Sequence, residues 1–188
     1  MLIYCYGASN TYGYDPRSYL GSRYPEEQRW TDILSRTLGH EFRNEGMNGR
    51  KIPRRSIEYP NVPPETDIFA VMLGTNEILQ GVSAAKAAEH LEKFLSELDF
   101  PKDKMLIIAP PILQKGDWVT QLSTAARSAK LGAEFAEVAR RLGAHFADGT
   151  RWDIPVTFDG VHFSAEGHAA FAEALGKLFT NGEFDCII

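Results

Sequence analysis

The sequence predicts an α/β fold in three layers, in which helices cover both faces of a five-stranded parallel sheet. Short apolar runs alternate with segments of helical periodicity, and strands joined by helices in this order require right-handed crossovers. Polar motifs follow the apolar runs, as in sheets that bind ligands beyond the carboxyl ends of their strands. With 188 residues, of which 44% are hydrophobic, the chain is long enough for one well-buried core. We therefore expect a single domain over residues 1–188.

Five short apolar runs are typical of strands that are buried inside a parallel sheet. They lie at Leu2–Tyr6, Glu41–Asn44, Asp67–Leu73, Met105–Ala109 and Ala144–Ala147. Because helical segments separate these runs, we expect their carboxyl ends to meet at one edge of the sheet.

Helical periodicity appears in four segments between and after these strands. They lie at 30–38, from Ser83 to Leu98, at Thr124–Leu142 and after Ser164. Gly39 and Gly143 directly follow two of these segments and are typical stop signals, because glycine readily adopts the left-handed conformation of a helix end. Ser83 precedes another segment and is a candidate N-cap.

The composition argues against two classes of partner. A formal net charge of −5 and an isoelectric point near 5.6 lack the basic field that nucleic acids and anionic membranes require. Met1–Tyr6 carries no basic region and continues into Gly7, so we expect a strand there rather than a signal peptide, and a cytoplasmic protein. Cys5 and Cys186 are expected to be free thiols.

Two short motifs at opposite ends of the chain supply a nucleophile, a base and a carboxylate. Ser9 follows the first apolar run, and Asp159 and His162 lie three residues apart across an Asp-Gly turn. A serine hydroxyl needs an imidazole to take its proton, and the imidazole needs an anion to hold it in the right tautomer. We therefore predict that Ser9, His162 and Asp159 form a catalytic triad.

Two other histidine-based sites compete with this assignment. His168 lies only six residues from His162, but within the last helix and without an acidic partner at the spacing of Asp159, so packing is its expected role. Asp148, Asp159 and His162 are residue types that bind metals, yet no metal-binding spacing supports them. We therefore expect neither a metal nor another cofactor.

Four blocks of the sequence, taken together, resemble the GDSL or SGNH hydrolases, a family of esterases and lipases. They read Gly7-Ala8-Ser9-Asn10-Thr11-Tyr12-Gly13, Asn44-Glu45-Gly46-Met47-Asn48-Gly49-Arg50, Leu73-Gly74-Thr75-Asn76-Glu77 and Asp159-Gly160-Val161-His162-Phe163-Ser164. The resemblance covers nearly the whole chain, and within the family it is strongest to the small arylesterases and acyltransferases. It implies the SGNH hydrolase fold, with a flavodoxin-like sheet.

The resemblance also implies an oxyanion hole. Its donors would be the backbone N–H groups of Ser9 and Gly49 and the side-chain amide of Asn76. Each fixed donor aimed at the oxygen of a tetrahedral intermediate is worth roughly 100 to 1,000-fold in rate. Taken singly, Gly49 and Asn76 are equally compatible with ordinary turns.

Two positions depart from the family pattern. Ala8 stands where the family usually has aspartate, so the hydrogen bonds of that carboxylate to neighbouring loops are missing. Glu77 replaces the usual aspartate after Asn76, with one additional methylene. No proposed catalytic group is lost through the change to Ala8.

These features predict a serine esterase that acts on small carboxylic esters with short acyl chains. We expect five further residues, all in or beside the predicted loops, to contact the substrate: Asn10, Arg50, Trp118, Trp152 and Phe158. Three alternatives stay open, namely an acyltransferase, a carbohydrate O-deacetylase and a non-catalytic binding module with the same fold. A small-molecule ester is the expected partner, without nucleic acid or membrane, and the sequence leaves a homo-oligomer open.

Overall fold

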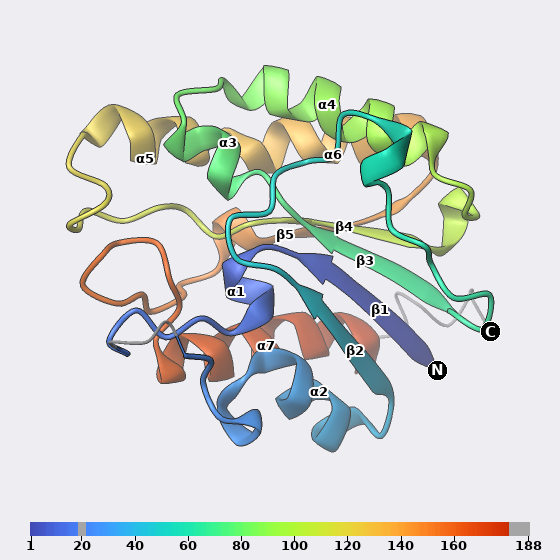
Figure 1. Cartoon of the computed structure of the whole chain (residues 1–188), viewed down its shortest axis with the longest axis horizontal. Helices are drawn as coiled ribbons and strands as arrows, with labels where there is room; N and C mark the ends of the chain where they lie inside the picture. The colour runs from blue at the N-terminus through green and yellow to red at the C-terminus, as the bar shows by residue number, and fades with distance from the viewer. Residues whose placement is uncertain (19–21, 181–188) are drawn as a thin grey trace.

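A five-stranded parallel sheet forms the centre of the molecule in the computed structural model, which describes residues 1–18 and 22–180 (Figure 1). The strands are β1 (Leu2–Gly7), β2 (Glu41–Gly46), β3 (Ile68–Met72), β4 (Met105–Ala109) and β5 (His145–Asp148). Their order in the sheet is β2-β1-β3-β4-β5, and every neighbouring pair is parallel. The predicted α/β class and the flavodoxin-like order are therefore confirmed.

Helices cover both faces of this sheet, which gives the predicted three layers (Figure 1). The helices are α1 (Ser9–Tyr12), α2 (Trp30–Leu38), α3 (Thr75–Leu79), α4 (Ala84–Glu97), α5 (Leu122–Ser128), α6 (Leu131–Leu142) and α7 (Ala165–Thr180). Helices α2 and α7 pack together on one face, and α4 and α6 pack together on the other. Short 3₁₀ turns lie at Glu26–Gln28, Ser56–Glu58, Lys102–Lys104 and Gly149–Arg151.

Each face of the sheet has its own apolar core. Phe69, Phe94 and Phe135 are buried between the sheet and the α4–α6 layer. Trp30 and Phe171 are buried in the α2–α7 layer, with their ring centroids 5.1 Å apart. Burial of an aromatic side chain of this size contributes about 1.5–3 kcal/mol, so these rings hold the helical layers against the sheet.

The helix signals of the sequence are found where they were expected. Gly39 and Gly143 both have the left-handed conformation, with φ of 68° and 69°, and end α2 and α6. The Ser83 hydroxyl accepts a hydrogen bond from the backbone N–H of Lys86 and caps α4.

The long helix predicted at Thr124–Leu142 is wrong, because the segment forms two helices, α5 and α6, with a break after Ser128. The Ser128 hydroxyl donates to the carbonyl of Ala125 and accepts from the backbone N–H of Leu113, so this side chain is bonded both within its own turn and across to another loop. Helical periodicity alone does not register such a tertiary contact.

Of the two cysteines, Cys5 is the one that lies within the described residues. Cys186 lies outside the described residues, whereas Cys5 is a buried free thiol in β1, as expected.

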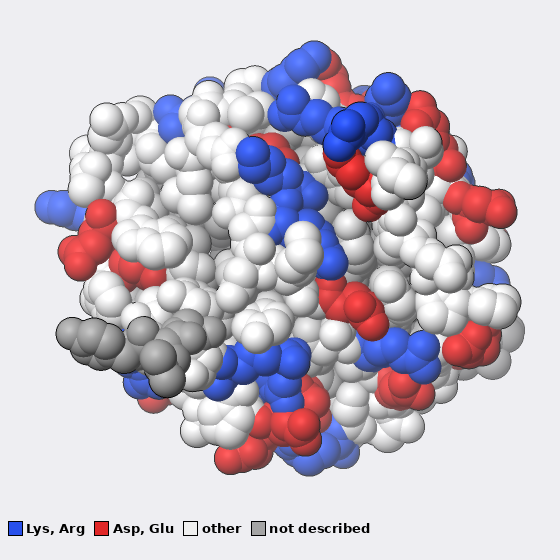
Figure 2. All heavy atoms as spheres, in the orientation of Figure 1, with Lys and Arg blue, Asp and Glu red and all other residues white. Residues whose placement is uncertain are grey.

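In the part of the chain that the structure describes, none of the helices has the length and apolar character that crossing a membrane requires. On the face seen in Figure 2, Lys and Arg side chains are interspersed with Asp and Glu side chains.

The strand order decides where a ligand site can form. β1 has β2 on one side and β3 on the other, so the connections that leave β1 and β3 diverge at their carboxyl ends. These ends point to the left in Figure 1, toward α1 and the orange loop that precedes α7.

Candidate active site

Ser9 is held at the carboxyl end of β1 by the close approach of α1 to the sheet. A Cβ atom on Gly7 would lie 2.0 Å from Oγ1 of Thr11, and one on Gly46 would lie 2.0 Å from the backbone nitrogen of Tyr12. Glycine at both positions therefore allows the first turn of α1 to sit directly on the ends of β1 and β2. As a result, Ser9 is buried at the start of this turn with its hydroxyl turned toward the loop before α7.

The structure brings Ser9, His162 and Asp159 into one hydrogen-bonded row. Nε2 of His162 lies 3.0 Å from Oγ of Ser9, and Nδ1 of His162 lies 2.6 Å from Oδ2 of Asp159. All three side chains are buried. Both distances lie within the range in which a base can take a proton and a carboxylate can orient it.

Asp159 accepts more hydrogen bonds than the one from the imidazole. Its Oδ1 accepts from the Thr157 hydroxyl and from the backbone N–H groups of Val161 and His162. Burial raises the pKa of the Asp159 carboxyl, but the hydrogen bonds from His162 and Val161 outweigh this effect and lower it to about 2. Asp159 is therefore an anion across the neutral range, as an orienting carboxylate must be.

Asn10 connects the serine segment to the histidine segment. Its Nδ2 donates to the carbonyl of Val161 at 3.0 Å, and its Oδ1 accepts from the backbone N–H of Phe163 at 3.0 Å. These two bonds hold the residues on either side of His162 to a residue that lies more than 150 positions earlier in the sequence. The indole N–H of Trp30 in turn donates to the Asn10 carbonyl.

Gly49 and Asn76 reach the same edge from the ends of β2 and β3. Gly49 has φ of 72°, a conformation that favours glycine, in a turn closed by the bond from Arg50 N–H to the Met47 carbonyl. Nδ2 of Asn76 donates to the carbonyl of Arg50 at 2.9 Å, so the amide is fixed beside this turn. An amide nitrogen carries two hydrogens, and this bond uses one of them.

A pocket of about 290 Å³ opens over these groups, lined by Ser9, Tyr14, Asn48, Gly49, Asn76, Trp118 and His162. The predicted serine, histidine, glycine and asparagine thus share one cavity, together with Trp118. Tyr14 and Asn48 were not assigned from the sequence. The sequence signals for these two residues are their positions, since Asn48 directly precedes the turn glycine and Tyr14 directly follows the block that ends at Gly13.

Four of the residues expected to contact the substrate are absent from this pocket, and their other contacts explain why. Both ends of the Asn10 side-chain amide are bonded to the backbone of the histidine segment. Arg50 donates to the carbonyls of Gly7 and Glu45 and lies 4.0 Å from the centre of the Tyr6 ring. Its guanidinium is therefore turned into the protein rather than toward a ligand.

The two aromatic residues in this group lie elsewhere. Trp152 is partly buried and packs against the core, with its ring centroid 5.2 Å from that of Phe171 of α7. Phe158 is exposed, and its carbonyl accepts a bond from the N–H of Asp117. Asn10, Arg50, Trp152 and Phe158 thus do not line the pocket over Ser9, and their contact with a substrate stays a prediction.

His168 occupies a different environment from His162. It is fully buried in α7, and its Nδ1 accepts from the backbone N–H of Trp30. Burial lowers the pKa of His168 to about 3, so this imidazole stays neutral in the core. Among residues 1–18 and 22–180, no group of three or more His, Cys, Asp and Glu side chains has the arrangement of a metal site.

The two departures from the family pattern have local explanations. Ala8 is buried in the apolar core on the α4–α6 side, where a small apolar side chain fits. The Glu77 carboxylate accepts a bond from the N–H of Ile52 at 2.9 Å. Asn76 and Glu77 therefore tie α3 to two points of the loop that follows Gly49, at the Arg50 carbonyl and at the Ile52 N–H.

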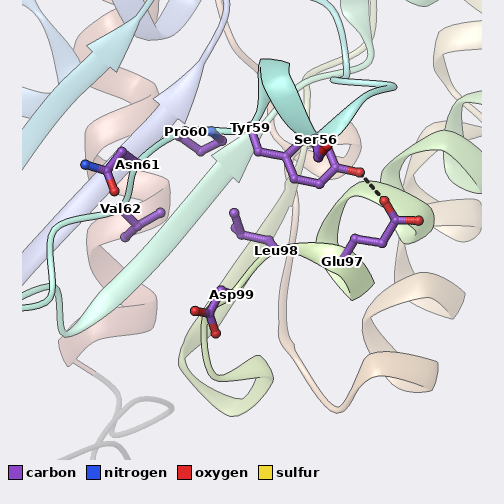
Figure 3. A pocket seen from close by; sticks show the side chains of 8 residues that line it. All are labelled: Ser56, Tyr59, Pro60, Asn61, Val62, Glu97, Leu98 and Asp99. Atoms are coloured by element: carbon purple, nitrogen blue, oxygen red, sulfur yellow. Dashed lines mark hydrogen bonds between the residues drawn. The ribbon is translucent and has the colours of Figure 1, made fainter.

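A second pocket, of about 430 Å³, lies between the 56–62 segment and the end of α4 (Figure 3). The Tyr59 hydroxyl donates to Glu97 across it, at 2.6 Å. Its lining contains neither a histidine nor any of the residues predicted for catalysis. The smaller pocket over Ser9 is therefore the candidate active site.

Comparison with known proteins bears on the fold and the family of this chain. Among solved structures, a carbohydrate acetylesterase family member from Sinorhizobium meliloti is 25% identical, with a TM-score of 0.77 over 96% of this chain and 98% of that one. The inhibitor-bound aryl esterase of M. smegmatis is 19% identical, with a TM-score of 0.80 over 95% and 98% of the two chains, which shows a shared fold. A comparison with curated proteins finds no match. The model of the GDSL-like lipase/acylhydrolase family matches residues 5–170, and this chain therefore belongs to that family.

Proposed function

We propose that this chain is a serine esterase that hydrolyses small carboxylic esters through an acyl-enzyme on Ser9. The observation that carries the proposal is the row from Asp159 through His162 to Ser9, with separations of 2.6 and 3.0 Å, which ends in the pocket of about 290 Å³. A buried serine that touches a carboxylate-bound imidazole is the arrangement that activates a hydroxyl for acyl transfer.

In the first half of the reaction, Oγ of Ser9 attacks the ester carbonyl carbon while Nε2 of His162 takes the hydroxyl proton. The negative charge moves to the carbonyl oxygen, where the N–H groups of Ser9 and Gly49 and the amide of Asn76 stabilise it. The ionised Asp159 stabilises the imidazolium. The bond from carbon to the alcohol oxygen then breaks, and the alcohol leaves with the proton from His162.

In the second half, water takes the place of the alcohol. His162 removes a proton from the water as its oxygen attacks the acyl carbon, and the bond to Oγ of Ser9 breaks. The proton returns from Nε2 to Oγ, and the carboxylic acid leaves. Every step uses side chains and backbone groups of this chain.

The size of the pocket favours a short acyl chain. About 290 Å³ is at or below the lower limit of sites that hold drug-sized ligands, so an acetyl or butyryl group fits more easily than a long chain. The Sinorhizobium meliloti structure, a carbohydrate acetylesterase family member, supports an acetyl group as the acyl part. The net charge of −5 and the mixed surface charges support a small ester as the partner, rather than a nucleic acid or an anionic membrane (Figure 2).

A fluorophosphonate probe tests the nucleophile. We expect covalent labelling of the wild-type protein and none of Ser9→Ala, whereas equal labelling of both proteins contradicts the proposal. With p-nitrophenyl esters, we expect hydrolysis to fall steeply from acetate and butyrate to palmitate. A preference for palmitate contradicts the short-chain substrate, and absence of labelling in the wild type favours a binding module instead.

A further inference from the structure

Two aromatic rings flank the imidazole of His162 inside the pocket. The ring of Tyr14 lies 4.8 Å from that of His162, and the indole of Trp118 lies 5.2 Å from it. Both rings meet the imidazole at steep angles, of 63° and 82°. The indole of Trp118 remains 57% exposed although it lines the cavity.

Trp118 is attached to the segment that carries the acid and the base. Its backbone N–H donates to the Asp159 carbonyl at 3.0 Å, and the preceding Asp117 donates to the Phe158 carbonyl at 3.1 Å. A Cβ atom on Gly116 would lie 2.4 Å from the backbone of Asp159 and Gly160, so the two segments touch main chain to main chain. Val119, which follows Trp118, is buried and fixes the chain on the other side of the tryptophan.

The indole of Trp118 has a more defined position than a single exposed ring elsewhere on a surface. Single apolar side chains on a surface are common and need no explanation. Trp118 differs because its backbone is fixed to the Asp159 segment while its ring lines the pocket beside His162. Its ring is therefore available to a ligand at a defined place.

The proposed chemistry places the alcohol part of the ester at this ring. His162 must protonate the leaving oxygen, so that oxygen lies at Nε2 when the ester bond breaks. The carbonyl oxygen is held on the side of Gly49 and Asn76. The carbon atoms of the alcohol therefore extend toward the two aromatic rings beside the imidazole, those of Tyr14 and Trp118.

We propose that Trp118 is a specificity-determining residue that stacks against a ring in the alcohol part of the substrate. The inference rests on the proposed function and adds the substrate class, a short-acyl ester of an alcohol whose ring offers a flat face to the indole. Sugar rings and aromatic rings both have this property. Stacking gives no advantage to an open-chain alcohol of similar basicity.

The test compares three acetate esters of primary alcohols, which differ in the ring. Benzyl acetate carries an aromatic ring, a methyl 6-O-acetylglucopyranoside carries a sugar ring, and propyl acetate carries none. We expect Trp118→Ala to lower kcat/KM about tenfold for at least one of the ring esters and less than threefold for propyl acetate. Trp118→Phe is expected to restore most of the loss for that ester, and the ester affected identifies the kind of ring.

Leu122→Ala is the matched control, since Leu122 is also an exposed apolar residue but lies outside the pocket, at the start of α5. It is expected to leave all three rates unchanged. An equal loss for all three esters in Trp118→Ala overturns the inference, because Trp118 then only supports His162, and so does a loss below threefold for both ring esters. If the fluorophosphonate probe labels the wild type but none of the three esters is hydrolysed, the inference alone fails. If the wild type is not labelled either, the proposed function fails and the inference fails with it.

Discussion

Asn10 is the residue whose removal most directly tests how the two ends of the chain are joined. Its side chain makes two buried hydrogen bonds, to the carbonyl of Val161 and from the N–H of Phe163, which lie on either side of His162. Asn10→Ala leaves both backbone groups without a partner. Each unpaired buried group costs about 1–3 kcal/mol, so we expect the free energy of unfolding to fall by about 2–4 kcal/mol. For a chain of this length, that corresponds to a fall of about 5–15 °C in Tm.

The same change is expected to reduce activity, because the position of His162 relative to Ser9 depends on these two bonds. A misplacement of about 1 Å can cost about 100-fold in rate, so we expect kcat on p-nitrophenyl acetate to fall by that order with little change in KM. Urea unfolding and steady-state kinetics measure the two effects.

Asn44→Ala provides a matched control. Asn44 in β2 is also bonded through both ends of its amide, to Thr11 and Thr31 and from the N–H of Gly46, but it does not touch the His162 segment. We expect a similar loss of stability with kcat within about threefold of the wild type. The reasoning is refuted if Asn10→Ala keeps its kcat and unfolds within about 0.5 kcal/mol of the wild type, or if Asn44→Ala loses as much activity.

Two further predictions concern the buried carboxyl groups. In Asp159→Asn, an amide N–H replaces the acceptor of the imidazole proton and favours the wrong tautomer, so we expect kcat to fall about 10⁴-fold. Because the pKa of Asp159 in the folded protein, about 2, is below its ordinary value of 3.8, its ionised form contributes about 2 kcal/mol of stability above pH 5. That contribution is lost as the pH falls toward 2, so the difference in unfolding free energy between wild type and variant should narrow in acid; a constant difference from pH 7 to pH 3 would contradict this. For Glu77 the dependence of stability on pH has the opposite sign, because burial raises the pKa of its carboxyl. Stability is therefore lost as the pH rises above the pKa of this carboxyl in the unfolded state. Glu77→Gln should therefore gain stability relative to the wild type between pH 4 and pH 7 in urea unfolding, and a relative loss would rule out the burial effect.

Much of the fold could be predicted because its signals are local. The predicted segments matched all five strands to within two residues at each end, and Gly39 and Gly143 marked two helix ends through their backbone conformation. The break between α5 and α6 could not be predicted in this way. It coincides with a bond between the Ser128 hydroxyl and the N–H of Leu113, fifteen positions away.

The residues of the candidate site could likewise be predicted only in part from the sequence. Ser9, Asp159 and His162 could be selected from the sequence because acyl transfer needs those residue types and because Asp159 and His162 are neighbours along the chain. Asn10 and Arg50 were expected to contact a substrate because they lie in the predicted loops, directly after Ser9 and Gly49. Their actual partners are backbone groups, some of them up to 153 positions away.

The sequence by itself therefore determined the order of the strands along the chain and the chemical groups available at their carboxyl ends. Those features depend on side-chain type and on spacing over a few residues. Only the tertiary structure decided which polar groups face the cavity and which satisfy buried backbone, since that choice depends on partners brought close by folding. Trp118 and Trp152 illustrate the difference. Both tryptophans are near the predicted loops, but Trp118 lines the pocket, whereas Trp152 packs against the core.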